Sequence, residues 1–240
     1  MPAAGDVTKR MIEAALALAS EGRWRDVSLV DVARRAEVSL LDAYRTMPDK
    51  ASLLASLIAA TDRQVLAAGP ADALDPPRDR LFDVLMRRFD ALQERRAGVT
   101  AILRDLPYDP VAAISVLPRF ATAIAWMLET AGLSSAGLAG NLRIKALAVI
   151  YLRTLQVWLD DDSADMARTM AALDKTLRRA EQMVRNIPGL RPTVSEAPGS
   201  AYAGADSVSP PFADEGELPA APPPASPAAP PPVPPSPSMA

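Results

Sequence analysis

The chain of 240 residues contains no cysteine and no histidine, and aromatic residues make up only 5% of it. Without cysteine it can form neither a disulfide nor a thiolate metal site. Without histidine it lacks the commonest general base and metal ligand. Catalysis would be left to carboxylate pairs or to Ser/Lys chemistry, and the sequence has no phosphate-binding glycine loop. We therefore expect no enzyme, no metal site and no cofactor.

Long apolar runs are also missing. The N-terminal apolar run is only about eight residues long and is interrupted by Glu13, which does not fit a signal peptide. No other stretch approaches the roughly 20 apolar residues that a membrane span needs. The sequence therefore predicts a soluble cytoplasmic protein without a membrane span.

Proline is unevenly distributed along the chain. Of the 24 prolines, 15 lie between Arg191 and Ala240, where alanine, serine and glycine fill most of the other positions. Proline fixes φ and removes a backbone donor, so such a segment builds neither a helix nor a sheet. We predict a disordered Pro/Ala-rich tail over residues 190–240. A solvated tail without a specific role is the simplest interpretation, and a proline-rich ligand for a partner is the alternative.

The segment from Ser28 to Leu54 predicts two short helices separated by a tight turn and followed by a longer third helix. Ser28 is a favourable N-cap, and Asp31, three positions on, can return a hydrogen bond to the cap. Ser39 begins the second helix in the same way, with Asp42 three positions on. The repeated cap signal indicates where each of the two helices starts.

Val38 lies in the turn between these helices, where we expect it to be buried. Pro48 ends the second helix, because a proline disfavours helix in the residue before it. A short helix held across a preceding one by small residues is the helix-turn-helix arrangement, whose second helix can enter the major groove of DNA. The segment therefore predicts binding to double-stranded DNA.

This segment and the helix before it resemble the N-terminal domain of the TetR family of bacterial transcriptional regulators, over roughly residues 7 to 60. The matching residues are Ala14, Ala15, Leu16, Gly22, Ser28, Val32, Ala33, Ala36, Val38, Ser39, Tyr44, Pro48, Lys50, Leu53 and Leu54. The resemblance implies an all-α fold with a three-helix DNA-binding head over residues 5–65. It also implies a helical ligand-binding and dimerisation domain over residues 75–188.

The sequence departs from the family pattern in the turn and at the start of the second helix. Glu37 stands where glycine is common, and a non-glycine residue with positive φ costs on the order of 1 kcal/mol. Leu40, Leu41 and Asp42 stand where the family usually shows polar, small or basic residues, and we expect Asp42 to cap the helix rather than to contact a base. Residues 1–60 carry eight basic and eight acidic residues, so the head has no net positive charge to attract phosphates.

Candidate DNA-binding residues lie at the two caps, on the second helix and at the start of the third. They are Ser28, Leu29, Arg34, Ser39, Leu40, Leu41, Asp42, Tyr44, Arg45 and Lys50. Phosphate contacts would come from Arg34, Arg35, Arg45, Lys50 and the backbone N–H groups at the two caps. We expect Tyr44→Ala and Lys50→Ala to weaken DNA binding, and Lys50→Ala also to lower its salt dependence.

Residues 78–187 predict five or six helices, bounded by proline, glycine and capping signals. We expect them at about residues 78–96, 100–106, 118–131, 138–159 and 163–186, with residues 107–110 as a loop. Ser163 would be the N-cap of the last helix. The acidic residues 160–162 would interact favourably with the positive end of the helix dipole.

Apolar residues form one stripe along the last predicted helix and follow two faces of the helix before it. A helix that is apolar on two sides lies deep in a core or is shared with a partner. The TetR resemblance implies a dimer formed by these helices, with recognition helices about one DNA turn (roughly 34–36 Å) apart on a palindromic operator. The candidate dimerisation residues are Leu142, Val149, Met166, Met170, Leu173 and Leu177, and an ordinary core is the alternative for them.

Aromatic and methionine residues of the predicted body are candidates for a ligand pocket. They are Phe89, Phe120, Trp126, Met127, Tyr151 and Trp158. Such residues more often form a core, but a pocket lined by them would take an apolar or amphipathic small-molecule effector. Arg143, Lys145 and Arg153 are candidates for contacts with an anionic head group. Binding would shift the population towards a conformer whose two heads no longer fit the operator, which in this family usually relieves repression.

A second resemblance concerns residues Ala148–Tyr151 and Trp158–Leu173. They are similar to the C-terminal half of the lipid-binding accessory proteins of ubiquinone biosynthesis, which share the TetR fold but have lost DNA binding. The Trp-Tyr pair with which those proteins engage a hydroxylase would fall near Gly140, and their amphipathic membrane helix has no counterpart after Pro188. This resemblance implies the alternative function of a lipid-binding accessory protein of quinone biosynthesis.

Overall fold

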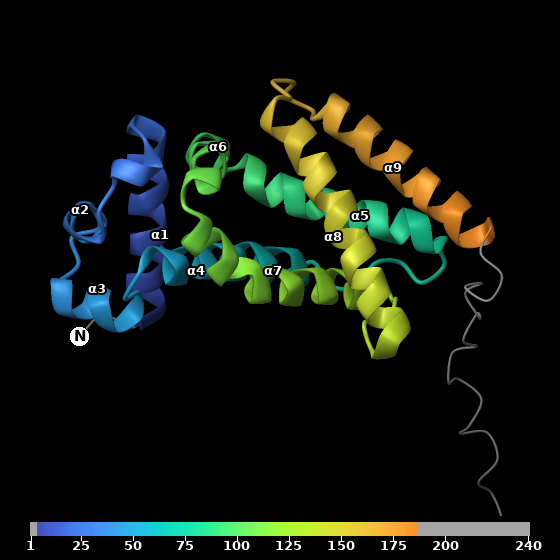
Figure 1. Ribbon diagram of the computed structural model, residues 1–240, viewed down its shortest axis with the longest axis horizontal. Coiled ribbons are helices and arrows are strands. Elements are labelled where there is room, and N and C mark those ends of the chain that lie inside the picture. The colour runs from blue at the N-terminus through green and yellow to red at the C-terminus, as the bar shows by residue number, and fades with distance from the viewer. Residues whose placement is uncertain (1–3, 187–240) are drawn as a thin grey trace, which may run out of the picture. The chain divides into compact units, whose positions relative to one another are not determined.

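Nine α-helices and two short 3-10 helices build residues 4–186, the part of the chain that this computed structural model describes (Figure 1). No strand occurs within this range, so the predicted all-α class is confirmed. The predicted tail over residues 190–240 lies outside the described residues.

Four α-helices form the head: α1 (Ala4–Glu21), α2 (Leu29–Arg35), α3 (Leu40–Thr46) and α4 (Lys50–Ala67), with a 3-10 turn, η1 (Trp24–Asp26), after α1. Along α1, Val7, Met11 and Ala15 recur at helical spacing and are buried against the helices that follow. A capping box between Asp49 and Ser52 starts α4. The same helix continues into the body, where it packs on α7.

Five α-helices form the body: α5 (Pro77–Gln93), α6 (Arg96–Asp105), α7 (Pro110–Thr130), α8 (Gly137–Leu159) and α9 (Ala167–Asn186), with a 3-10 turn, η2 (Leu106–Tyr108), before α7. α7 begins at Pro110 and not at Pro118 as predicted, because the Asp109 carboxylate accepts a hydrogen bond from the Ala112 N–H (3.0 Å) and Pro110 suits the first helical position. Pro118 instead lies inside α7 on its exposed side, where water can reach the carbonyl left without a donor.

The head and the body are in direct contact. α1 lies against α6 most closely at Gly98, where a Cβ atom would stand 2.4 Å from the carbonyl oxygen of Leu16. Only a glycine permits this approach. The boundary predicted between residues 65 and 75 falls at the end of α4 and in the loop before α5. The packing of α1 on α6 and of α4 on α7 crosses that boundary.

α7 is apolar enough to span a membrane by length and composition. It is 21 residues long and has a mean hydropathy of 1.7 in its most apolar window. The expectation that no stretch approaches a membrane span is therefore wrong by this criterion. Core helices of soluble proteins meet the same criterion, and α7 contributes Ala123, Ile124 and Met127 to the core. Only 33% of its apolar window is buried, so α7 also presents an exposed apolar face.

Candidate nucleic-acid interface

Both predicted helix caps of the helix-turn-helix are present. The Ser28 side chain accepts a hydrogen bond from the Asp31 N–H (3.1 Å), and the Asp31 carboxylate accepts one from the Ser28 N–H (3.3 Å). At the start of α3, the Ser39 side chain accepts from the Asp42 N–H (3.1 Å), and its hydroxyl donates to the Asp42 carboxylate (2.7 Å). Asp42 therefore serves the cap, as we expected.

The turn between α2 and α3 is held by a residue that the sequence did not indicate. Glu37 adopts the predicted left-handed conformation, with φ 53°. The guanidinium group of Arg10, on α1, donates hydrogen bonds to the carbonyl oxygens of Ala36 and Glu37, the latter at 2.8 Å. The Val38 N–H donates to the Ala33 carbonyl (3.0 Å) and closes the turn. Arg10 thus satisfies carbonyls left free at the end of α2.

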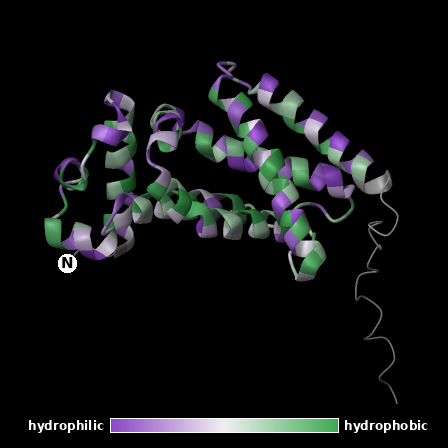
Figure 2. Cartoon of the chain, in the orientation of Figure 1, coloured by the Kyte–Doolittle hydropathy of each residue, from purple (hydrophilic) through white to green (hydrophobic). Residues whose placement is uncertain are grey.

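α3 buries one side in the head and exposes the other. Ala43 and Met47 are buried. Leu40, Leu41 and Tyr44 are 60%, 57% and 69% exposed, and Arg45 is exposed beside them. Figure 2 shows the hydrophobic colour at the start of this helix. The predicted recognition helix therefore presents an apolar and aromatic surface with one cation. The predicted contact residue Leu29, by contrast, is partly buried against the core of the head.

Most of the cations that we expected to contact phosphate have partners within the protein. Arg34 pairs with Asp31 (3.1 Å) on the exposed surface of α2, and Arg35 pairs with Glu21 of α1 (2.6 Å). Arg45 has no charged or hydrogen-bonding partner among the described residues. The head therefore offers DNA fewer free positive charges than its count of arginines suggests.

Lys50 differs from our prediction of a phosphate contact. Its ammonium group donates hydrogen bonds to the carbonyl oxygens of Trp24 (3.0 Å) and Arg25 (3.2 Å), and it lies over the Trp24 ring at 4.8 Å. Burial of this group lowers the pKa of Lys50. The side chain ties the start of α4 to the η1 turn, a role that spacing along the sequence could not reveal.

Five of the predicted ligand-lining residues lie in the core of the body. The Phe89 and Tyr151 rings stack with centroids 5.4 Å apart, Phe120 lies 5.7 Å from Tyr151, and Trp158 lies 6.4 Å from Phe89. Met127 is buried as well. Trp126 is 54% exposed on the outer side of α7, so its prediction as a lining residue is wrong.

Two open pockets of the described residues lie elsewhere, between α1, α4 and the turn that leads into α6. The larger has a volume of about 480 Å³. The three cations expected near a ligand head group, Arg143, Lys145 and Arg153, are exposed on α8 and do not face the aromatic cluster. α8 carries the buried aromatic residues on one face and these cations on another, because the residues of a helix point in different directions around its axis.

A buried ionic cluster lies beside these aromatic rings and joins four helices. Asp62 of α4 binds Arg88 of α5 (2.5 Å) and Arg119 of α7 (2.8 Å), and the Arg88 Nε donates to the Tyr151 hydroxyl of α8 (3.3 Å). Asp62 and Arg88 are almost fully buried. Burial lowers the pKa of Arg88, but Tyr151 and Asp62 raise it more, so the guanidinium group stays charged. Two guanidinium groups share one carboxylate, so the cluster carries one net positive charge.

The apolar stripe of the last helix faces inwards. Met166, Leu173 and Leu177 are buried within the subunit, where α9 packs on α8 and α5. The prediction of these three as dimerisation residues is therefore wrong, and the alternative of an ordinary core holds for them. Met170 is only partly buried. Leu142 and Val149 of α8 are half exposed, so the predicted outer face of α8 remains accessible.

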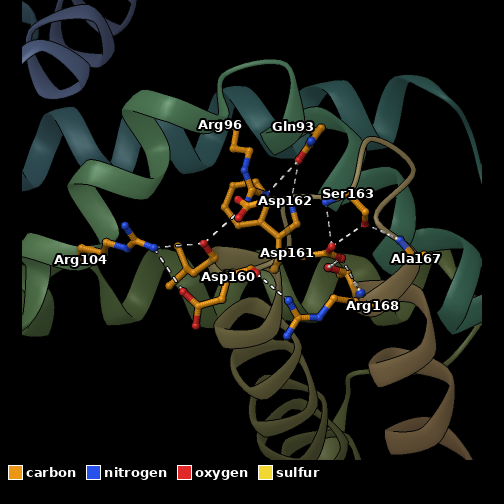
Figure 3. A network of polar contacts seen from close by, with 12 residues as sticks. Gln93, Arg96, Arg104, Asp160, Asp161, Asp162, Ser163, Ala167 and Arg168 are labelled. Atoms are coloured by element: carbon orange, nitrogen blue, oxygen red, sulfur yellow. Dashed lines mark hydrogen bonds and ion pairs between the residues drawn. The ribbon is translucent and has the colours of Figure 1, made fainter.

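The acidic run before α9 forms a turn in which Asp161 is buried while Asp160 and Asp162 are exposed (Figure 3). Asp161 is buried, and its carboxylate accepts hydrogen bonds from the Ser163 and Thr169 N–H groups and from both hydroxyls. Desolvation raises the pKa of Asp161, but these hydrogen bonds outweigh it and hold the pKa well below its usual value. The Ser163 side chain still accepts from the first N–H of α9, that of Ala167 (3.1 Å), although the helix begins later than predicted.

Two arginines of α6 complete this turn. Arg104 donates to the Leu159 carbonyl (3.3 Å) and pairs with Asp160 (3.2 Å), and Arg96 lies 4.8 Å from the Trp158 ring. Cations at the C-terminal end of α8 bond its free carbonyls and interact favourably with the negative end of its dipole. The turn therefore joins α6, α8 and α9, and Figure 3 shows these side chains converging on it.

Comparisons with known proteins agree with this geometry. The chain is 25% identical over 152 residues to the HTH-type transcriptional repressor KstR of Rhodococcus jostii, covering 63% of this chain and 72% of that protein. It is 27% identical over 181 residues to an uncharacterized HTH-type transcriptional regulator of Mycobacterium tuberculosis, covering 73% and 92%. No protein-family model matches the chain.

A solved structure extends the similarity to the fold. The TetR transcriptional regulator from Nitrosomonas europaea superposes with a TM-score of 0.58 and 25% identity, covering 73% of this chain and 98% of that one. A capped helix-turn-helix with an exposed second helix, carried on an all-helical body, defines a DNA-binding transcriptional regulator. In sequence and in fold, the chain is similar to these HTH-type and TetR transcriptional regulators.

Proposed function

We propose that this protein is a repressor that binds a palindromic operator as a homodimer and releases it when a small molecule binds. The observation that carries the proposal is the exposed face of α3, which two serine caps and Arg10 hold in the orientation of a recognition helix. The similar KstR protein of Rhodococcus jostii is named a repressor, which supports repression rather than activation.

The exposed apolar surface of α7 and α8 supports the dimer. These two helices pack against each other and leave large apolar side chains uncovered: Val111, Ile114, Leu117, Trp126, Leu138, Leu142, Val149 and Leu152. Apolar patches of this kind mark interaction sites, and a second copy of the chain would cover them. A two-fold dimer with recognition helices about one DNA turn apart, roughly 34–36 Å, would match a palindromic site.

The ionic cluster at Asp62 supports a response to a ligand. α4 begins directly after the recognition helix and carries Asp62 into the body, so any change at the cluster acts on the head through one continuous helix. A ligand that binds one position of α4 better than another shifts the population towards it.

The first test is selection of binding sites from fragmented genomic DNA of the host by the full chain at physiological salt. Enrichment of a few palindromic sequences supports the proposal. We expect Arg45→Ala to weaken binding to these sequences, because Arg45 is the cation on α3 without a partner among the described residues. If it contacts a phosphate, the salt slope falls by about 0.9 per contact. Leu74→Ala is the matched control, since Leu74 is 93% exposed in the loop after α4.

Recovery of DNA without any enriched sequence would contradict the proposal. It would favour the alternative of a TetR-fold lipid-binding accessory protein, and mass spectrometry of lipid that copurifies with the chain would then test that function. Sedimentation of the full chain tests the dimer separately. We expect Leu142→Arg to convert a dimer to a monomer, because a charge on the outer face of α8 would have to be buried.

A further inference from the structure

Two neighbouring leucines open the recognition helix and point away from the head. Leu40 and Leu41 are both more than half exposed, and neither contributes to the core of the subunit. Their backbone is fixed, because the Ala43 N–H donates to the Ser39 carbonyl (2.9 Å) and the Ala43 side chain is buried. The leucines therefore occupy the helix positions that contact base edges in a helix-turn-helix complex.

The charges around these leucines leave little else to read the bases. The side chains of Ser39 and Asp42 are engaged with each other in the cap. Arg34 and Arg35 pair with carboxylates, and the Lys50 ammonium group is bonded to backbone carbonyls. A leucine donates and accepts no hydrogen bond, so it can distinguish bases only through apolar contact. In the major groove, the apolar group on a base edge is the C5-methyl group of thymine.

We propose that Leu40 and Leu41 read thymines through their 5-methyl groups. This inference rests on the proposed function, since it requires α3 to enter the major groove. Successive residues of an α-helix point about 100° apart, so the two leucines contact different bases. Each half-site of the operator therefore contains at least two thymines whose methyl groups determine affinity. Tyr44 and Arg45 lie one turn further along α3, beside this apolar pair.

The experiment replaces thymine by deoxyuridine in the best DNA site that the full chain selects. This substitution removes the methyl group and keeps every hydrogen-bonding atom of the base. Burial of a methyl-sized group changes a binding constant by about fourfold, so we expect about a fourfold loss of affinity for each contacted thymine. Replacement of the remaining thymines should leave affinity unchanged. The dissociation constants are measured by fluorescence anisotropy at one fixed salt concentration.

Single variants assign each methyl group to its leucine. We expect Leu40→Ala to abolish the effect of deoxyuridine at one position of each half-site and Leu41→Ala to abolish it at another. Both side chains are exposed, so neither variant should change the melting temperature. Leu74→Ala is again the control and should retain the full sensitivity to deoxyuridine at every position.

The possible failures are distinguishable. Equal affinity for the thymine and deoxyuridine forms of a selected site would overturn the reading of methyl groups and leave the proposed function intact. Weaker binding by the leucine variants with undiminished sensitivity to deoxyuridine would also overturn it, because the leucines would then contact the sugar–phosphate backbone or a protein partner. Failure to select any sequence would overturn the proposed function and this inference together.

Discussion

Removal of the Asp62 charge tests how the body holds α4. Asp62 is 5% exposed, and its two carboxylate oxygens bind Arg88 (2.5 Å) and Arg119 (2.8 Å). Asp62→Asn keeps the shape of the side chain but removes its charge. Arg88, which is 3% exposed, would then hold a buried positive charge without a counter-ion, because the amide oxygen at position 62 and the Tyr151 hydroxyl are both neutral acceptors.

The expected loss of stability is large. Removing one partner of a buried ion pair costs about 3–5 kcal/mol. In a domain of this size each kcal/mol corresponds to about 2–4 °C in Tm, so we expect Asp62→Asn to lower Tm by about 6–20 °C. The control is Asp83→Asn, because Asp83 pairs with Arg87 at 2.5 Å but is 46% exposed. A surface pair contributes about 0–1 kcal/mol, so the control should shift Tm by less than about 4 °C.

The assay is thermal unfolding of the full chain at pH 7, followed by far-ultraviolet circular dichroism. A double variant, Asp62→Leu with Arg88→Met, removes both buried charges and should recover most of the stability that Asp62→Asn loses. A loss for Asp62→Asn no larger than that of Asp83→Asn would refute the reasoning. It would mean that water reaches Asp62 and that the cluster does not hold α4 against α5 and α7.

Three further predictions follow from single groups. Asp161→Asn should destabilise the α8–α9 turn most at neutral pH. The pKa of Asp161 is lowered in the folded protein, so its carboxylate stabilises the fold above the unfolded pKa of about 4. The difference in Tm between the variant and the unaltered chain should therefore narrow as the pH falls below about 4. Thermal unfolding between pH 2.5 and pH 7 measures it, and a difference independent of pH would contradict the ionic role. Glu37→Gly should stabilise the head by about 1 kcal/mol, because glycine adopts φ 53° without strain; a fall in Tm would show that the exposed ion pair between the Glu37 carboxylate and Arg10 (4.0 Å) outweighs that strain. Lys50→Ala should lower Tm and leave the salt slope of DNA binding unchanged, since the Lys50 ammonium group bonds the Trp24 and Arg25 carbonyls. A lower salt slope at unchanged Tm would instead support the prediction that Lys50 contacts a phosphate.

Local signals determined the fold class and the position of the helix-turn-helix. Ser28 and Ser39 each bond a partner three residues away, so the spacing of residue types was enough to predict both caps. The same holds for Asp42, whose role in the cap follows from its distance to Ser39. The positive φ at Glu37 was expected from the family resemblance, because glycine is common at that position of the turn. Interactions within one helical turn depend on sequence neighbours, and the sequence specifies those completely.

Only the tertiary structure decided which face each helix buries and where the long cationic side chains end. Lys50 bonds carbonyls 25 and 26 residues away, and Asp62 binds arginines 26 and 57 residues away. The stripe through Leu173 was visible in the sequence, but the sequence did not tell whether α8 or a second subunit covers it. A periodic pattern records that a helix has an apolar face. The neighbour that covers this face depends on how helices far apart in the chain pack, and so does the partner of a buried charge.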